Sequence, residues 1–114
     1  MEDCLFCRIA AGEIPSDKVY EDEQVLAFRD INPQAPVHVL VIPKKHIRDV
    51  GDIIPEDGAL IAHLFEVVGI LADRLGIAED GYRVVSNVGT YGQQSVPHLH
   101  LHVMGGRQMT WPAG

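Results

Sequence analysis

The fold is decided by the stretch His98-Leu99-His100-Leu101-His102-Val103, in which histidine alternates with an aliphatic residue. Successive side chains of a β-strand point to opposite faces of a sheet, so this alternation predicts a strand over residues 98–104. We expect the three imidazoles on one face and the aliphatic side chains on the other. Consecutive histidines would then lie roughly 6–7 Å apart, close enough for all three to contact one small ligand.

The segments around this strand predict the rest of the fold. Four other stretches rich in β-branched and apolar residues are typical of strands: residues 19–20, 24–29, 37–42 and 82–87. Residues 4–11 fit a short helix. Strands in runs broken by one long helix predict an α+β fold in a single domain, 1–114, with an antiparallel sheet of about five strands. Open sheet edges favour a two-fold dimer.

Residues 55–75 fit the long helix, because apolar residues recur at helical spacing. Pro55 suits the first helical turn and Gly76 suits the left-handed stop. The side chains that we expect in one buried stripe are Leu60, Leu64, Val67, Val68, Leu71 and Leu75.

Charge and hydropathy exclude several classes of protein. Nine basic and sixteen acidic residues give a net charge of −7, which disfavours binding of a nucleic-acid polymer. A single nucleotide is not disfavoured, because one phosphate responds to local donors.

No run of about eighteen apolar residues occurs, so we expect no membrane span. The acidic start, Met1 to Cys4, is unlike a secretory signal, which predicts a cytoplasmic protein.

The alternating histidines admit three interpretations. They can be solvated side chains on an exposed sheet face, ligands of one metal ion, or a nucleophile with its acid–base partners. The first is weak because nothing else demands three histidines there. The second lacks a nearby acidic residue in sequence. Neutral imidazole is nucleophilic at neutral pH, so we favour nucleophilic catalysis on phosphorus.

The histidine run closely resembles the motif of the histidine triad nucleotide-binding proteins, and the similarity spans nearly the whole chain. The family's early strand and turn are similar to Ala27-Phe28-Arg29-Asp30-Ile31-Asn32-Pro33-Gln34-Ala35-Pro36, and the end of its next strand is similar to Val41-Ile42-Pro43-Lys44-Lys45-His46. The tail of its purine nucleoside phosphoramidase branch is similar to Gly105-Gly106-Arg107-Gln108-Met109-Thr110-Trp111-Pro112.

The resemblance implies catalytic roles. His100 would attack the α-phosphorus and form a nucleotidylated histidine that water then hydrolyses. His102 would hydrogen-bond the phosphate and assist proton transfer, and His38 occupies the position of the family's additional active-site histidine. Ser95 would help the leaving group to depart. From the residues alone, His38 shares a strand face with Leu40, and a lone histidine in that position is more often a core residue.

Some of the expected substrate-binding residues lie in the glycine-bearing loop 88–96. Its amide, hydroxyl and backbone N–H groups are suited to binding a phosphate, although a loop of this composition is usually only a turn. The resemblance implies phosphate contacts, a ribose contact at Asp30, an apolar base pocket, and Trp111 reaching towards the partner subunit's site. Gln93 replaces a glycine common in the family. The full expected set is Asp30, Ile31, Asn87, Gln93, Gln94, Ser95, Phe6, Ile9, Leu40 and Trp111. The resemblance also places Phe28 in the base pocket, but from the residues alone a core role is the safer interpretation for it.

Cys4-Leu5-Phe6-Cys7 has a spacing that can bind Zn²⁺, but a tetrahedral site needs two further ligands. The resemblance implies that His46 and His98 supply them and that the zinc is structural. Without zinc, His98 would be an orienting residue and both cysteines free thiols. We expect no organic cofactor.

The function implied by these residues is hydrolysis of nucleoside 5'-phosphoramidates, with a purine nucleotide as substrate, in a homodimer. Three alternatives stay open at this point. They are a dinucleoside polyphosphate hydrolase or nucleotidyl transferase, a non-catalytic nucleotide-binding or scaffold module, and a metalloenzyme that uses the histidines as ligands.

Overall fold

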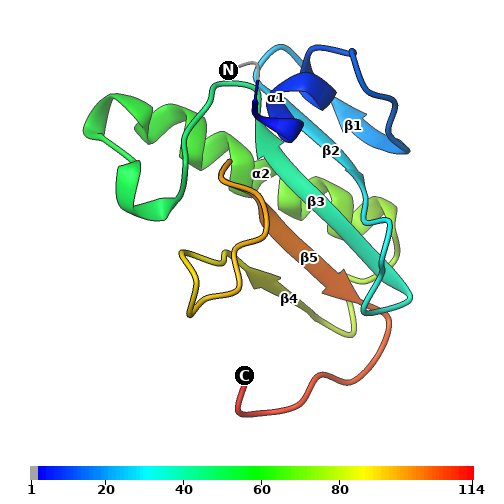
Figure 1. The fold of residues 1–114 in the computed structure, drawn as a ribbon. Helices are drawn as coiled ribbons and strands as arrows, with labels where there is room; N and C mark the ends of the chain where they lie inside the picture. The colour runs from blue at the N-terminus through cyan, green and yellow to red at the C-terminus, as the bar shows by residue number, and fades with distance from the viewer. Residues whose placement is uncertain (1–2) are drawn as a thin grey trace.

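The computed structural model describes residues 3–114 and contains the predicted α+β arrangement (Figure 1). Met1 and Glu2, part of the acidic start, lie outside the described residues. In chain order the elements are α1 (Leu5–Ala10), β1 (Lys18–Glu21), β2 (Val25–Arg29), β3 (Val37–Pro43), two 3-10 turns (Val50–Asp52 and Pro55–Asp57), α2 (Gly58–Arg74), β4 (Tyr82–Val85) and β5 (Leu101–Gly105).

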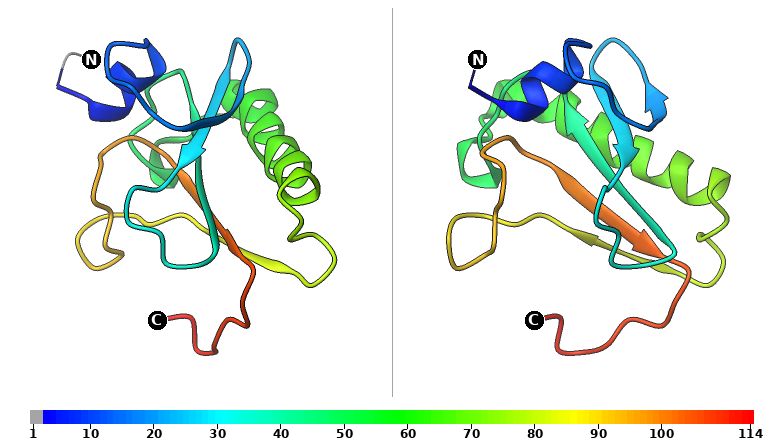
Figure 2. Two further views of the ribbon diagram at one scale, coloured as in Figure 1. Left: turned by 90° about the vertical axis from the view of Figure 1, so that its right-hand side faces the viewer. Right: turned by 45° about the vertical axis from the view of Figure 1, so that its right-hand side comes forward.

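The sheet has five strands in the order β1-β2-β3-β5-β4, and every neighbouring pair is antiparallel. α2 covers one face, and α1 lies on the opposite side (Figure 2). Because β-strands alternate, each strand supplies both layers: Val39 and Val41 of β3 face α2, while Leu40 and Ile42 face α1. Among residues 3–114, no helix is long and apolar enough to span a bilayer.

The long helix begins later than predicted. Residues 55–57 form a 3-10 turn with Pro55 at its start, and the α-helical hydrogen bonds begin at Gly58. Gly76 ends the helix with φ of +75°, as predicted. The expected stripe is buried at its centre, at Leu64, Val67, Val68 and Leu71, whereas Leu60 and Leu75 are only partly buried.

The histidine strand is shorter than predicted, since β5 begins at Leu101 and leaves residues 98–100 outside the ladder. The prediction of a strand from residue 98 is therefore wrong at its start. The partner strand β3 ends at Pro43, which has no N–H to donate, and the N–H of Leu99 instead bonds the Ile47 carbonyl oxygen at 2.6 Å. The alternation survives, because Leu99 and Leu101 still lie in the core beneath α2.

A polar contact connects α2 with the β1–β2 turn. The Asp22 carboxylate accepts hydrogen bonds from His63 Nε2 at 2.6 Å, from the Tyr20 hydroxyl at 2.7 Å, and from two backbone N–H groups of its own turn. Partial burial acts to raise the Asp22 pKa, but these hydrogen bonds outweigh it and hold that pKa well below its usual range. The same hydrogen bond to Asp22 raises the pKa of His63.

His63→Gln should lower stability in a pH-dependent way. Because the pKa of His63 is raised on folding, the ion pair stabilises the fold fully below the unfolded pKa, about 6.5. Its contribution is lost as pH rises through the folded pKa. Both side chains are partly exposed, so we expect a loss of about 0.5–1 kcal/mol, or about 2–5 °C in Tm, at pH 6. Thermal unfolding of both chains from pH 6 to 9 tests this, and a Tm difference independent of pH would contradict it.

Candidate active site

The α1 side of the sheet carries a cavity of about 210 Å³ whose walls come from α1, β2, β3 and the histidine segment. It brings together eight of the residues expected to bind substrate or act in catalysis. Phe28 also lines it. Three further lining residues, Leu5, Arg29 and Val96, were not expected from the sequence. The full lining is Leu5, Phe6, Ile9, Phe28, Arg29, Asp30, Ile31, Leu40, Ser95, Val96, His100 and His102.

Hydrogen bonds fix the tautomer of His100. Its Nδ1 lies 2.7 Å from the carbonyl oxygen of His98, which can only accept, so Nδ1 carries the proton. The lone pair of the neutral ring is therefore on Nε2. The ring is buried, 3% exposed, and the Phe6 ring packs edge-on against it at 5.1 Å between centroids. His100 thus has the tautomer and the fixed orientation that a nucleophile requires.

A second series of hydrogen bonds fixes His38 and His102. The backbone N–H of Gln34 donates to His38 Nδ1 at 2.9 Å, so neutral His38 carries its proton on Nε2. His38 Nε2 lies 2.9 Å from His102 Nδ1 and donates to it. The proton of neutral His102 is then on its Nε2. Sequence reasoning missed Gln34, because a backbone donor leaves no signal in residue type.

Both imidazoles of this series are uncharged at neutral pH. Burial lowers the pKa of His38, and the nearby Asp30 carboxylate opposes the shift only in part. Burial also lowers the pKa of His102, to about 4, and repulsion from the positively charged forms of His100 and His38 adds to the effect. At neutral pH the direction of the hydrogen bonds is therefore set by neutral tautomers.

Asp30 makes the Asx turn expected before Pro33, since its Oδ1 accepts the Asn32 N–H at 2.8 Å. Its Oδ2 lies 3.4 Å from His38 Nε2 and 3.9 Å from His102 Nδ1. These three atoms are close enough to hold a metal ion. The tautomers argue against one, because His38 Nε2 carries a proton as long as Gln34 donates to Nδ1. This cluster is better suited to hydrogen bonding than to coordination.

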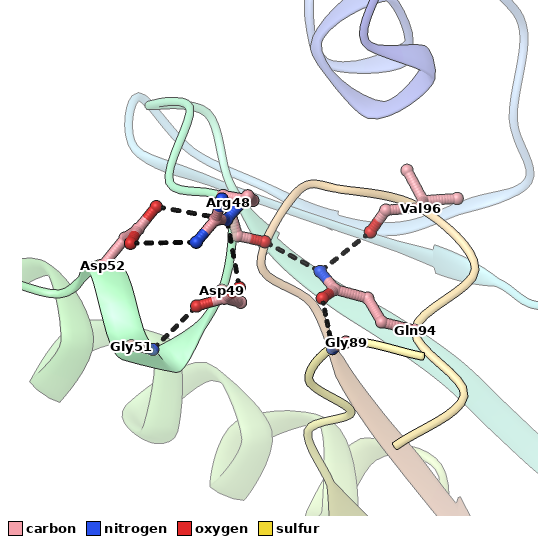
Figure 3. A network of polar contacts seen from close by, with 7 residues as sticks. All are labelled: Arg48, Asp49, Gly51, Asp52, Gly89, Gln94 and Val96. Carbon is pink, nitrogen blue, oxygen red and sulfur yellow. Dashed lines mark hydrogen bonds and ion pairs between the residues drawn. The ribbon is translucent and has the colours of Figure 1, made fainter. Parts of the chain in front are cut away.

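Gln94 holds the loop 88–96 in place (Figure 3). Its side-chain Nε2 donates to the carbonyl oxygens of Arg48, at 2.8 Å, and Val96, at 3.1 Å, while its Oε1 accepts the Gly89 N–H at 3.1 Å. The amide expected to contact a phosphate is thus engaged within the protein. Its position directly before Ser95 gives it a role in placing that hydroxyl at the cavity.

The remaining expected contacts lie outside the cavity lining. Gln93 is exposed with φ of +63°, a left-handed conformation that favours glycine and stores strain in the loop. Asn87 is half-buried beyond β4, and Trp111 is 85% exposed in the C-terminal tail. These three side chains and Gln94 do not line the cavity described above.

A candidate cation site lies beside the cavity, where Cys4, Cys7, His46 and His98 bring four ligand atoms within 4.8 Å of one another. Cys4 Sγ is 3.2 Å from His98 Nδ1, and Cys7 Sγ is 3.3 Å from His46 Nδ1. The two imidazole Nδ1 atoms are 3.2 Å apart. A tetrahedral Zn²⁺ site places its ligand atoms about 3.3–3.8 Å apart, so the spacing fits.

The tautomer of His98 also fits a cation. Its ring is completely buried, and its Nε2 donates to the Pro43 carbonyl oxygen at 2.8 Å. The lone pair is therefore on Nδ1, the atom that faces the thiols. Both cysteines are free, and burial together with the neighbouring Cys4 raises the pKa of the Cys7 thiol to about 11.

Comparison with known proteins agrees with this geometry. An uncharacterised HIT-like protein of Synechococcus elongatus is 50% identical over 113 residues, which cover 99% of this chain and 98% of that one. A HIT family hydrolase from Legionella pneumophila has a crystal structure with a TM-score of 0.97 and 54% identity, covering 98% and 100% of the two chains. A histidine triad protein from Clostridium difficile has a TM-score of 0.93 and 46% identity, with 96% of each chain covered.

The model of the HIT domain family, the histidine triad family, matches residues 11–109, which include His38, the loop 88–96 and all three alternating histidines. With a family model over most of its length and relatives of this identity, the chain belongs to the HIT domain family.

Proposed function

We propose that the protein hydrolyses nucleoside 5'-phosphoramidates, with a purine nucleoside and adenosine in particular as the expected substrate, through a nucleotidyl-histidine intermediate at His100. The observation that carries the proposal is the hydrogen bond from His100 Nδ1 to the His98 carbonyl oxygen, which leaves Nε2 free to attack. The solved Legionella and Clostridium relatives, described as HIT family hydrolase and histidine triad protein, support the enzyme class.

Successive parts of the cavity wall match the base, the ribose and the phosphate of a nucleotide. Phe6, Ile9 and Leu40 supply an apolar wall for the base, with the fully exposed Ile31 at the rim. The Asp30 carboxylate is the acceptor for ribose hydroxyls. His100, His102 and Ser95 then lie at the phosphate end, where Ser95 Oγ and His102 Nε2–H supply donors for the phosphoryl oxygens. We propose Asn87 and the backbone around Gln93 and Gln94 as further phosphate contacts after loop movement.

The reaction has two steps. In the first, the His100 Nε2 lone pair attacks the α-phosphorus, and the P–N bond to the leaving group breaks. The leaving nitrogen takes a proton from the Ser95 hydroxyl, which takes one from solvent water in the same step, and the His98 carbonyl oxygen stabilises the positive charge on the His100 ring. In the second step water attacks phosphorus and gives its proton to solvent through Ser95, and the P–N bond to His100 breaks. The products are a nucleoside monophosphate and an amine.

We propose further that the four-residue cluster holds a structural Zn²⁺. Cys4, Cys7, His46 and His98 are the ligands, and the ion supplies a cross-link between α1, the segment after β3 and the histidine segment. No step of the reaction uses it.

A homodimer through the β4 edge is also part of the proposal. β4 is an edge strand with unpaired backbone groups, and it carries Tyr82, which is 38% exposed. Arg83 of this strand donates to the Thr110 carbonyl oxygen at 2.8 Å and so holds the tail, with exposed Trp111, along the same edge. A partner at this edge would cover both the strand and the tail.

His100→Ala should reduce turnover of adenosine 5'-phosphoramidate by at least about 10⁴-fold, because it removes the nucleophile itself. Rapid quench followed by intact-mass analysis should show a nucleotidyl adduct on the wild-type chain, mapped to His100, and none on the variant. His63→Gln, a histidine on α2 outside the cavity, is the matched control and should keep full turnover. Diadenosine polyphosphate cleaved faster than the phosphoramidate would favour the polyphosphate hydrolase. AMP binding without any adduct would leave only the binding module.

The purified chain should contain one Zn²⁺, and the double variant Cys4→Ser/Cys7→Ser should contain none, because hydroxyl oxygens replace both thiolates. Metal analysis measures the stoichiometry. Replacement by Co²⁺ should give thiolate-to-metal charge-transfer absorption in the wild type only. Turnover that survives excess chelator would confirm that the ion is structural, whereas turnover that depends on added metal would contradict the proposed chemistry.

A further inference from the structure

We propose that the Cys4–Cys7–His46–His98 cation site and the nucleotide cavity are thermodynamically coupled, so that Zn²⁺ and a nucleoside monophosphate each strengthen the binding of the other. This inference rests on the proposed function for both ligands. It is carried by two connections between the sites: the helix α1, which supplies residues to both, and His98, a residue of the cation site that is hydrogen-bonded to the cavity residue His100.

α1 supplies residues to both sites. Cys4 is its N-cap and Cys7 follows in the first turn, and both belong to the cation site. Phe6, between them, lines the nucleotide cavity and packs edge-on against Phe28 at 5.5 Å and against His100 at 5.1 Å between centroids. Whatever fixes the two thiols against the sheet therefore also fixes the aromatic wall of the cavity.

The helix depends on such contacts because it is short. Six residues, Leu5–Ala10, are too few for a helix to be stable on its own, so its position is set by packing and by the thiol–imidazole contacts. Without a cation these contacts are weak hydrogen bonds to sulfur of 3.2–3.4 Å. Four coordinate bonds would replace these hydrogen bonds and hold α1 at its observed position beside the cavity.

His98 makes the second connection. Its Nδ1 faces the thiols, while its backbone carbonyl oxygen accepts the His100 Nδ1–H at 2.7 Å. A cation that fixes the His98 ring also fixes the carbonyl group that sets the tautomer and direction of His100. The metal ligand and the nucleophile are thus two residues apart in the chain and joined by one hydrogen bond.

The sign of the coupling follows from these connections. The observed position of α1 suits both ligands, because in it the thiols lie near the imidazoles and Phe6 lies beside His100. Each ligand would therefore stabilise this one position, and the coupling is positive. Linkage requires the two effects to be equal: the factor by which Zn²⁺ raises AMP affinity is the factor by which AMP raises Zn²⁺ affinity.

The test measures this reciprocity on the full chain without any turnover. Calorimetric titration with AMP compares the Zn²⁺-loaded and the metal-free protein, and competition with a chromophoric chelator measures Zn²⁺ affinity with and without saturating AMP. We expect both affinities to rise by the same factor, about 10-fold within the usual range of roughly 5–150. Two measurable affinities with a factor of one would overturn the coupling and leave the proposed function standing. Failure of Zn²⁺ to bind would overturn the coupling and the structural zinc but leave the proposed hydrolase standing, whereas failure of AMP to bind would overturn the coupling and the proposed hydrolase.

Phe6→Ala tests the path through α1, because it keeps all four ligands and removes the aromatic wall. We expect near-normal Zn²⁺ affinity with a coupling factor reduced several-fold. Arg8→Ala is the matched control on the exposed side of the same helix, where the Arg8 guanidinium lies 4.0 Å from the Glu13 carboxylate, and it should keep the wild-type factor. An unchanged factor in Phe6→Ala would exclude the path through α1. If that variant fails to fold, the wild-type reciprocity still decides the proposal.

Discussion

The hydrogen bond from His98 Nε2 to the Pro43 carbonyl oxygen, 2.8 Å long and completely buried, determines how the whole site is arranged. The ladder between β3 and β5 ends at the Val41–Leu101 pair, and Pro43, which ends β3 and has no N–H, cannot extend it. The Pro43 carbonyl group therefore accepts from a side chain instead. The bond directs the lone pair of His98 towards the two thiols. It also holds the His98 backbone, whose carbonyl oxygen accepts from His100. One buried hydrogen bond thus orients both the His98 ring, which faces the thiols, and the His98 carbonyl group, which accepts from His100.

The tautomers of His38, His100 and His102 are fixed by groups that do not titrate. One series of hydrogen bonds starts at the Gln34 N–H and runs through His38 to His102, and the other ends at the His98 carbonyl oxygen. Backbone N–H groups only donate and carbonyl groups only accept, so neither series can reverse its direction. The result is a lone pair on His100 Nε2 and a proton on His102 Nε2. These two complementary groups on neighbouring rings are what attack on phosphorus requires.

The sequence predicted which side chains lie on which face of the sheet better than it predicted the hydrogen bonds that those side chains make. Alternation placed His98, His100 and His102 opposite the core leucines, and the same rule placed His38 beside Leu40. Those assignments depend only on the two-residue period of a strand, which survived even though β5 starts at residue 101.

The remaining features depend on tertiary contacts that carry no residue-type signal. The Gln34 donor is a backbone group, and the Gln94 side chain turned out to bond the Arg48 and Val96 carbonyl oxygens. An amide in a phosphate-binding loop has the same chemistry whether it faces a ligand or the protein. The sequence could name Gln94 as important, but only the packing of the loop against Arg48 distinguishes the two roles.

The charge of the cavity bears on how the proposed reaction proceeds. The chain has a net charge of −7, and Arg29, the one lysine or arginine among the described lining residues, lies 3.6 Å from Asp17. Burial lowers the pKa of His38 and His102, so the His102 ring that would face the phosphate is uncharged, as is the His38 ring behind it. N–H and O–H dipoles, rather than full charges, would then bind the ground-state anion. A full positive charge arises only when His100 bonds to phosphorus, so the strongest attraction develops during the covalent step and acts on the transition state more than on the bound substrate.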